Sequence, residues 1–166
     1  MSAVSISEST VYGIMNYLKA NLPACVAAIN TERNDNLTAI EAPKSYFPWE
    51  VAHAYRCPAI FVIDQDVDMR LEGGSNFIQP AHSLIVSVVV EDRTEEFLQK
   101  KCWRYQDAIF ACLNNIQIIT ENSNVKLIPK IKRFYFSENF SEKGEQLIFR
   151  KEVAAQIEVE HYENQS

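Results

Sequence analysis

Three aspartates at alternating positions have the spacing that comes nearest to a chemical site. Asp64, Asp66 and Asp68 follow an apolar run, and alternate side chains of an extended strand point the same way. Carboxylate oxygens placed like this can hold Ca²⁺ or Mg²⁺. A calcium-binding EF-hand loop starting at Asp64 would need Gly and Glu where Met69 and Ser75 stand. We therefore interpret the run as the solvated end of a hairpin and predict no metal and no cofactor.

The histidines and cysteines show no spacing that is typical of catalysis. His53, His82 and His161 lie far apart and outside any HxxH or HExxH pattern, so we expect surface or loop positions for them. No glycine-rich phosphate-binding motif occurs, and the sequence is predicted not to be an enzyme. No CxxC pair or nucleophile signature surrounds the cysteines, and we expect free, buried thiols at Cys25, Cys57, Cys102 and Cys112.

Composition and charge limit the classes of partner. The 166 residues carry a net charge of −6, which disfavours non-specific binding to nucleic acid. No apolar run reaches the roughly 20 residues that a membrane span needs. The first ten residues, MSAVSISEST, lack the basic and apolar regions of a signal peptide, so we expect synthesis in a reducing cytoplasm. We predict neither a membrane partner nor sequence-specific binding of nucleic acid.

Basic residues gather on one predicted strand, 125–136. Strict alternation would place Lys126, Lys130 and Lys132 on one face and Arg133 on the other. Two interpretations stay open. The cluster is either a solvated face or a salt-bridged contact with an acidic neighbour, such as the strand that carries glutamates from 152 to 160.

Apolar spacing predicts two helices. The first covers about residues 11–29, where Pro23 predicts a kink, or a break with Asn21 as a new cap. The second runs from about Thr94 to Asn115. Between the first helix and the next apolar run, residues 31–56 read as irregular. Four aromatic residues in this segment either cover the edge of the core or anchor a neighbouring subunit: Tyr46, Phe47, Trp49 and Tyr55.

Strand signals fill the rest of the chain. Residues 58–63 form a short apolar run, 67–71 could be a second arm, and 73–76 read as a turn. The strongest strand signal, 83–91, is apolar enough for burial on both faces. The last strand, within 146–162, alternates, with Val153, Ala155, Ile157 and Val159 on its apolar face. We predict an α+β two-layer domain over residues 1–166, with a mainly antiparallel sheet packed against two helices.

This pattern resembles the tail terminator, or tail completion, proteins of tailed bacteriophages, including the family typified by the minor tail protein of phage lambda. The segments that carry the resemblance are TVYGIMNYLKANLP, CPAIFVID, SLIVSVVVEDRTEEF and KKCWRYQDAIFACLNN, followed by two strands. It covers roughly residues 9–160 and is a match of pattern rather than of catalytic residues. The segments 31–56 and 73–76 depart from the most compact members.

The resemblance implies a structural protein of the virion neck, assembled in the host cytoplasm. Such proteins form a ring, typically hexameric, that caps the tail tube, ends its polymerisation and joins the tail to the head connector. The implied partners are other copies of the chain, the tail tube protein and a connector or neck protein. An acidic ring would also let DNA pass without sticking to it.

Two further hypotheses remain from the residues. One is another connector protein, or an adaptor that binds a partner through the aromatics of 31–56, and the other is a metal-dependent enzyme that uses Asp64, Asp66 and Asp68. Under the first, structural hypothesis we expect interface roles for segment 43–56 and loop 64–80. We also expect Lys130, Lys132 and Arg133 to pair with acidic residues across an interface.

Overall fold

The computed structural model describes residues 6–35, 39–50, 55–71, 78–120, 125–142 and 147–163. In chain order its elements are α1 (Ile6–Arg33), β1 (Ser45–Phe47), β2 (Ala59–Leu71), β3 (Ile78–Asp92), α2 (Glu95–Leu113), β4 (Ile118–Ile119), β5 (Val125–Phe136), β6 (Phe140–Glu142) and β7 (Ile148–Glu163). Neither α1 nor α2 is long and apolar enough to cross a membrane.

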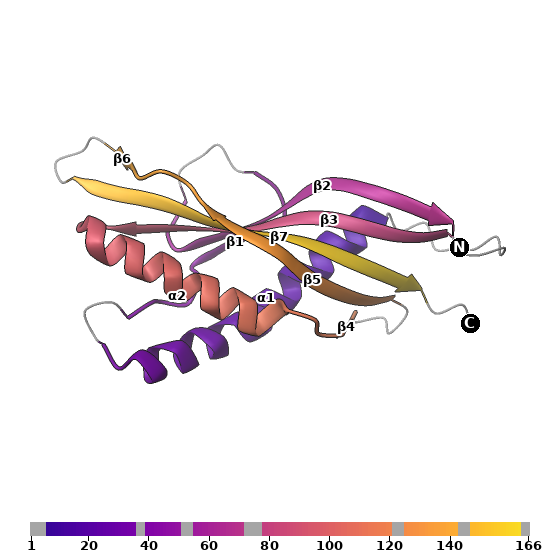
Figure 1. Ribbon diagram of the computed structural model, residues 1–166, viewed down its shortest axis with the longest axis horizontal. Coiled ribbons are helices and arrows are strands. Elements are labelled where there is room, and N and C mark those ends of the chain that lie inside the picture. Colours follow the sequence, from indigo (N-terminus) through magenta and orange to yellow (C-terminus); the bar gives the residue numbers. More distant parts are fainter. Residues whose placement is uncertain are drawn as a thin grey trace.

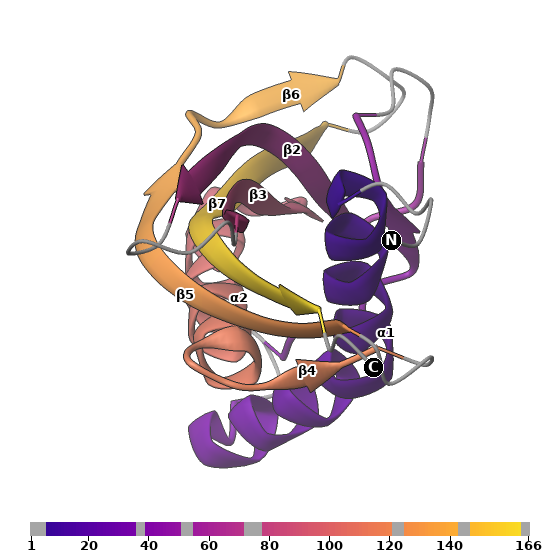
Figure 2. The same cartoon turned by 90° about the vertical axis from the view of Figure 1, so that its right-hand side faces the viewer.

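β3 and β7 lie at the centre of one sheet. The strand order is β1-β2-β3-β7-β5-β4, and β6 pairs with β7 beyond the end of β5. Among the described strands every pair is antiparallel except β1 with β2. Both helices pack on the same face of the sheet, whose strands are strongly curled (Figures 1 and 2). The fold is therefore the predicted α+β arrangement of a mainly antiparallel sheet against two helices.

Helix α1 continues through its proline. It runs unbroken from Ile6 to Arg33 with Pro23 inside it, and its axis changes direction along its length (Figure 2). Asn21 does not cap a second helix, because its Nδ2 donates a hydrogen bond to the Tyr17 carbonyl at 2.9 Å. The expected kink is in line with this bend, whereas the alternative break is wrong. The predicted apolar stripe is buried, including Val11, Ile14, Leu18, Leu22 and Val26.

The central strands fill the core as their sequences predict. One face of β3 packs under the helices, and on the opposite face Ser87 and Val89 are buried as well. The expected burial on both faces is therefore confirmed for residues 86–90, whereas residues 83, 85 and 91 of the opposite face are partly exposed. The predicted apolar face of β7 joins the same core. The helix-facing residues of these two strands are Leu84, Val86, Val88, Val90, Val153, Ala155, Ile157 and Val159.

Two expectations about the connections are corrected. Segment 31–56 is not irregular throughout, because α1 includes residues 31–33 and β1 pairs in parallel with residues 59–61 of β2. Residues 58–63 and 67–71 are not separate arms, since a bulge lets one strand continue across both. Most of the expected loop 64–80 is therefore the β2–β3 hairpin. The predicted turn at 73–76 lies outside the described residues.

Candidate functional site

The two outer strands leave most of the sheet's edges open. β1 pairs with β2 only at residues 59–61, and β4 pairs with β5 only at residues 126–127. The connection before β4 also reaches β5, because Asn115 N–H donates to the Pro129 carbonyl at 2.9 Å. Within the described residues, β2 has no outer neighbour from Val62 onward, and β5 has none from Lys132 onward. Open edges expose backbone donors and acceptors that can meet another chain.

The three aspartates lie on the open part of β2, but they do not share a face. Asp64 is opposite Leu84 and Asp66 is opposite Ser83, so the bulge between them reverses the alternation. Asp64 lies on the helix side, where it contacts the buried ring of His82, whereas Asp66 and Asp68 lie on the other side. The prediction that the alternate carboxylates point the same way is therefore wrong for Asp64 and confirmed for Asp66 and Asp68. In the described ranges no three His, Cys, Asp or Glu side chains are grouped to hold a metal ion.

The basic cluster lies on β5, where a second bulge changes the predicted faces. The register shifts between Ile131 and Arg133, so Lys132 is the extra residue and Arg133 returns to the face of Lys130. The prediction that Arg133 lies on the opposite face of the strand from the lysines is therefore wrong with respect to Lys130. Lys130 Nζ lies 3.0 Å from Glu160 Oε1, and Arg133 Nε donates to Gln156 Oε1 at 2.7 Å.

These contacts connect the basic strand to the acidic one within a single chain. The hydrogen bond from Lys130 lowers the pKa of the Glu160 carboxyl, and the same bond raises the pKa of Lys130. Of the two interpretations of the cluster, the contact with the acidic strand is therefore realised for Lys130. Lys132 and Arg133 are exposed, and neither forms an ion pair in the part of the chain that the structure describes.

The aromatic residues of segment 43–56 divide into two groups. Tyr46 packs against the main core, while Phe47 and Tyr55 pack around Phe61 on the opposite face, with ring centroids 5.3 and 5.0 Å from it. Trp49 differs because it is 58% exposed. Three of the four aromatics therefore cover the sheet, and Trp49 is the one that remains largely accessible to a partner. Residues 51–54 lie outside the described part of the chain.

Two histidines are buried, against expectation. His82 on β3 is fully buried, and His161 on β7 is 3% exposed, with Nδ1 3.0 Å from the Thr10 hydroxyl. The signal that sequence reasoning missed is alternation, because His82 is in phase with Leu84, and His161 is in phase with Val159. Both histidines therefore lie on the buried faces of their strands. His53 lies outside the described residues.

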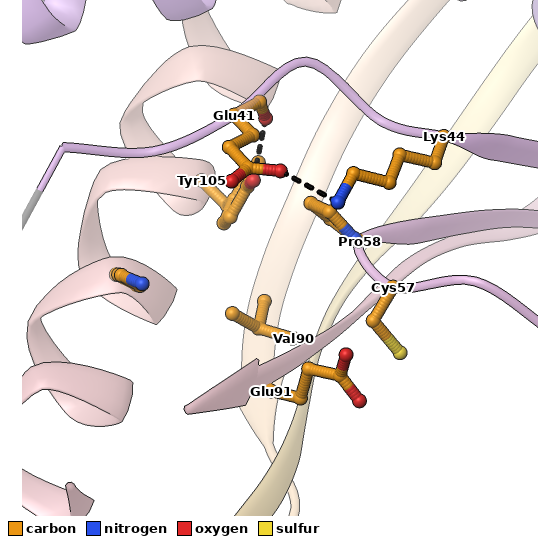
Figure 3. Close-up of a pocket in the computed structure, with 8 residues that line it drawn as sticks. Glu41, Lys44, Cys57, Pro58, Val90, Glu91 and Tyr105 are labelled. Atoms are coloured by element: carbon orange, nitrogen blue, oxygen red, sulfur yellow. Dashed lines mark hydrogen bonds and ion pairs between the residues drawn. The ribbon is translucent and has the colours of Figure 1, made fainter. Parts of the chain in front are cut away.

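A small polar cavity lies between segment 41–44, the end of β3 and the middle of α2 (Figure 3). Its volume is about 120 Å³, enough for several water molecules. Its charged groups are partly paired, since Lys44 Nζ lies 2.9 Å from Glu41 Oε2 and the Tyr105 hydroxyl donates to the Glu41 carbonyl at 2.6 Å. It is lined by Glu41, Lys44, Cys57, Pro58, Val90, Glu91, Lys101 and Tyr105. We interpret this cavity as a gap between packed elements that is large enough for water, rather than as a substrate site.

Comparisons with known proteins add little to this geometry. No protein-family model matches the sequence, and no curated protein matches it. Among solved structures 19 chains match, including one from the virion of a native gene transfer agent particle. That match has a TM-score of 0.35 and 12% identity, and it covers 86% of this chain and 97% of that chain. A TM-score this low gives the likeness no weight in assigning a function.

Proposed function

We propose that this chain is a structural protein of a phage-like virion that assembles into a ring at the tail neck. The observation that carries the proposal is the pair of open sheet edges, because a subunit that closes a ring needs two different contact surfaces. The element order supports it, since the segments that carry the resemblance to tail terminators fall on α1, β2, β3 and α2.

In this role the ring caps the tail tube, ends its polymerisation and joins it to the head connector. Segment 64–80, most of which belongs to the β2–β3 hairpin, is the contact we propose for the tube or for the neighbouring subunit, because it lies at an edge of the sheet and carries exposed carboxylates at Asp66 and Asp68. The net charge of −6 suits a channel that DNA passes without binding. A homo-hexamer located in the virion neck and assembled in the host cytoplasm is the form we propose.

The adaptor alternative gains little support from the structure. It requires the aromatics of segment 43–56 to form a shared binding surface. Phe47 and Tyr55 instead pack on Phe61, and Tyr46 packs on the main core. Trp49 alone of the four is largely exposed, which suits one anchor at a subunit boundary better than a peptide groove.

The first test is the mass of the purified protein, measured by light scattering after size exclusion at two concentrations. We expect closed oligomers near six subunits, or a monomer that forms them as concentration rises. The second test adds the protein to polymerising tail tube subunits and measures tube length by electron microscopy. Tubes that stop growing and carry the protein at one end support the proposal. Tubes that grow unchanged, with the protein free in solution, overturn it.

A further inference from the structure

We propose that neighbouring copies of this chain join by docking the acidic edge of one sheet against the basic edge of the next. The acidic edge is the open part of β2 with Asp66 and Asp68, and the basic edge is the open part of β5 with Lys132 and Arg133. The inference rests on the proposed ring and specifies its subunit contact. The occupant of each edge is a second copy of the same chain.

The strand order places the open stretches at opposite edges of the sheet. β3 and β7 lie between β2 and β5, and among the described residues the open part of β2 does not pair with that of β5 in the same chain. On β2 the open stretch begins at Val62, after the residues that pair with β1. On β5 it begins at Lys132, after the residues that β4 and the connection before β4 reach. A contact between unlike edges is head-to-tail, and head-to-tail contacts form a ring when the rotation between subunits closes.

The charges of the two edges are opposite. Residues 64–71 of β2 hold three aspartates and one basic residue, Arg70, whereas the open part of β5 holds Lys132 and Arg133 and no acidic residue. Lys130 is already tied to Glu160, but Lys132 and Arg133 are exposed without an ion pair in the described part of the chain. Asp66, on the other edge, is exposed and likewise forms no ion pair there. Complementary charge of this kind sets partner choice and orientation.

The same charges oppose the competing arrangements. Two β2 edges would bring aspartates together, and two β5 edges would bring lysine and arginine together, so a symmetric pairing of like edges is disfavoured. Each open stretch also lies at a bulge, at residues 64–66 and 131–133. Bulges and edge charges prevent indiscriminate strand pairing. Side-chain charge therefore decides which edge an incoming subunit meets.

Charge reversal of one edge at a time tests this contact. Asp66→Lys with Asp68→Lys makes both edges basic, and Lys132→Glu with Arg133→Glu makes both edges acidic. Asp64 is left unchanged because it contacts His82. We expect each variant alone to associate about tenfold or more weakly than the native chain, by sedimentation velocity. A 1:1 mixture of the two variants should regain assembly, because basic and acidic subunits can then alternate. Lys100→Glu on α2 is the matched control and should assemble like the native chain.

The mixing step separates loss of the contact from loss of folding, since misfolded subunits would not assemble on mixing. Assembly of the mixture should also weaken as salt rises from 0.15 M to 1 M, where the screening length falls from about 8 to 3 Å. If each variant alone assembles like the native chain, or the mixture stays dispersed, the edge contact is wrong. The ring proposal is judged separately by tube capping with the native chain.

Discussion

Tyr46 and Tyr105 both have buried hydroxyl groups, and the two side chains differ in one contact. The Tyr46 hydroxyl has no hydrogen-bond partner in the described structure, whereas the Tyr105 hydroxyl donates to the Glu41 carbonyl. An unsatisfied buried polar group costs about 1–3 kcal/mol. We therefore expect Tyr46→Phe to raise the free energy of unfolding by about 1 kcal/mol, and Tyr105→Phe to lower it by a similar amount. Urea titrations at pH 7 measure both changes in the free energy of unfolding. Changes of the same sign would contradict this difference in hydrogen bonding between the two hydroxyl groups.

Burial of Tyr46 also predicts that the free energy of unfolding depends on pH. Burial raises the pKa of Tyr46 from its ordinary value of 10.0 to about 12. As pH rises, the unfolded chain therefore loses this proton before the folded chain does, and the free energy of unfolding falls between about pH 10 and 12. Tyr46→Phe should make that fall shallower. Denaturation curves at pH 8, 10 and 11 measure the difference, and parallel pH profiles for the two proteins would argue against it.

Burial also separates the four thiols. Burial raises the pKa of Cys102 and of Cys112 to about 12, and Cys57 is buried too, whereas Cys25 is partly exposed. Buried, protonated thiols react slowly. At pH 8 we expect one thiol per native chain to react with a coloured disulfide reagent, against four in denaturant. Cys25→Ser should abolish the native reaction, and Cys102→Ser should leave it unchanged. Fast reaction of two or more thiols in the native chain would show that burial is weaker than described.

At the scale of elements, one asparagine joins the end of α1 to the segment before β1. Asn30 Nδ2 donates to the Ile40 carbonyl at 2.7 Å, and its Oδ1 accepts from the Ile40 N–H at 2.9 Å. Asn30→Ala leaves both backbone groups of a buried residue without this partner. We expect it to lower the free energy of unfolding by about 1–3 kcal/mol, measured by chemical denaturation.

Asn21→Ala is the matched control for this contact. Asn21 also hydrogen-bonds through its side chain, but only to the Tyr17 carbonyl one turn earlier in the same helix. Alanine has the higher helix propensity, so this change should cost little or nothing. If the two variants lose the same stability, the Asn30 contact does not hold the connection in place.

The elements show which features local sequence determines and which it does not. Both helices and the long strands β3, β5 and β7 follow from their apolar patterns, because each buries apolar side chains in the shared core. The short strands β1, β4 and β6 have two or three residues and carry no period of their own. The bulges at residues 65 and 132 depend on pairing with a neighbouring strand, which is non-local. Each bulge shifted the predicted faces of every charged residue beyond it.

At the scale of the molecule, the fold class was predictable, whereas the placement of the candidate site was only partly so. The sequence identified the acidic and basic segments, but their positions at opposite edges follow from the strand order, which brings β7 between β3 and β5. Local periodicity does not contain that order, since the last strand in the chain pairs with the third and fifth strands. The charges of Asp66 and Lys132 can be interpreted as parts of two complementary sheet edges only once the strand order is known.

Trp49 and Trp103 provide a test of which surface of the whole subunit is covered on assembly. They are the chain's only tryptophans, and they are similarly exposed, at 58% and 52%. Trp49 follows β1 beside the proposed subunit boundary, whereas Trp103 lies on α2. We expect Trp49→Ala to weaken association about tenfold, as for an aromatic interface anchor, with the free energy of unfolding unchanged within about 0.5 kcal/mol. Trp103→Ala should leave association unchanged.

Tryptophan fluorescence reports on the proposed subunit contact of Trp49 without replacing that residue. In a Trp103→Phe chain the emission comes from Trp49 alone, and it should shift to shorter wavelength as concentration drives assembly, because the indole leaves water. In a Trp49→Phe chain the remaining Trp103 emission should stay constant over the same range. If Trp103 shifts and Trp49 does not, α2 rather than segment 43–56 lies at the boundary between subunits. In that case the helical face, not the edge of the sheet near β1, contributes the aromatic anchor.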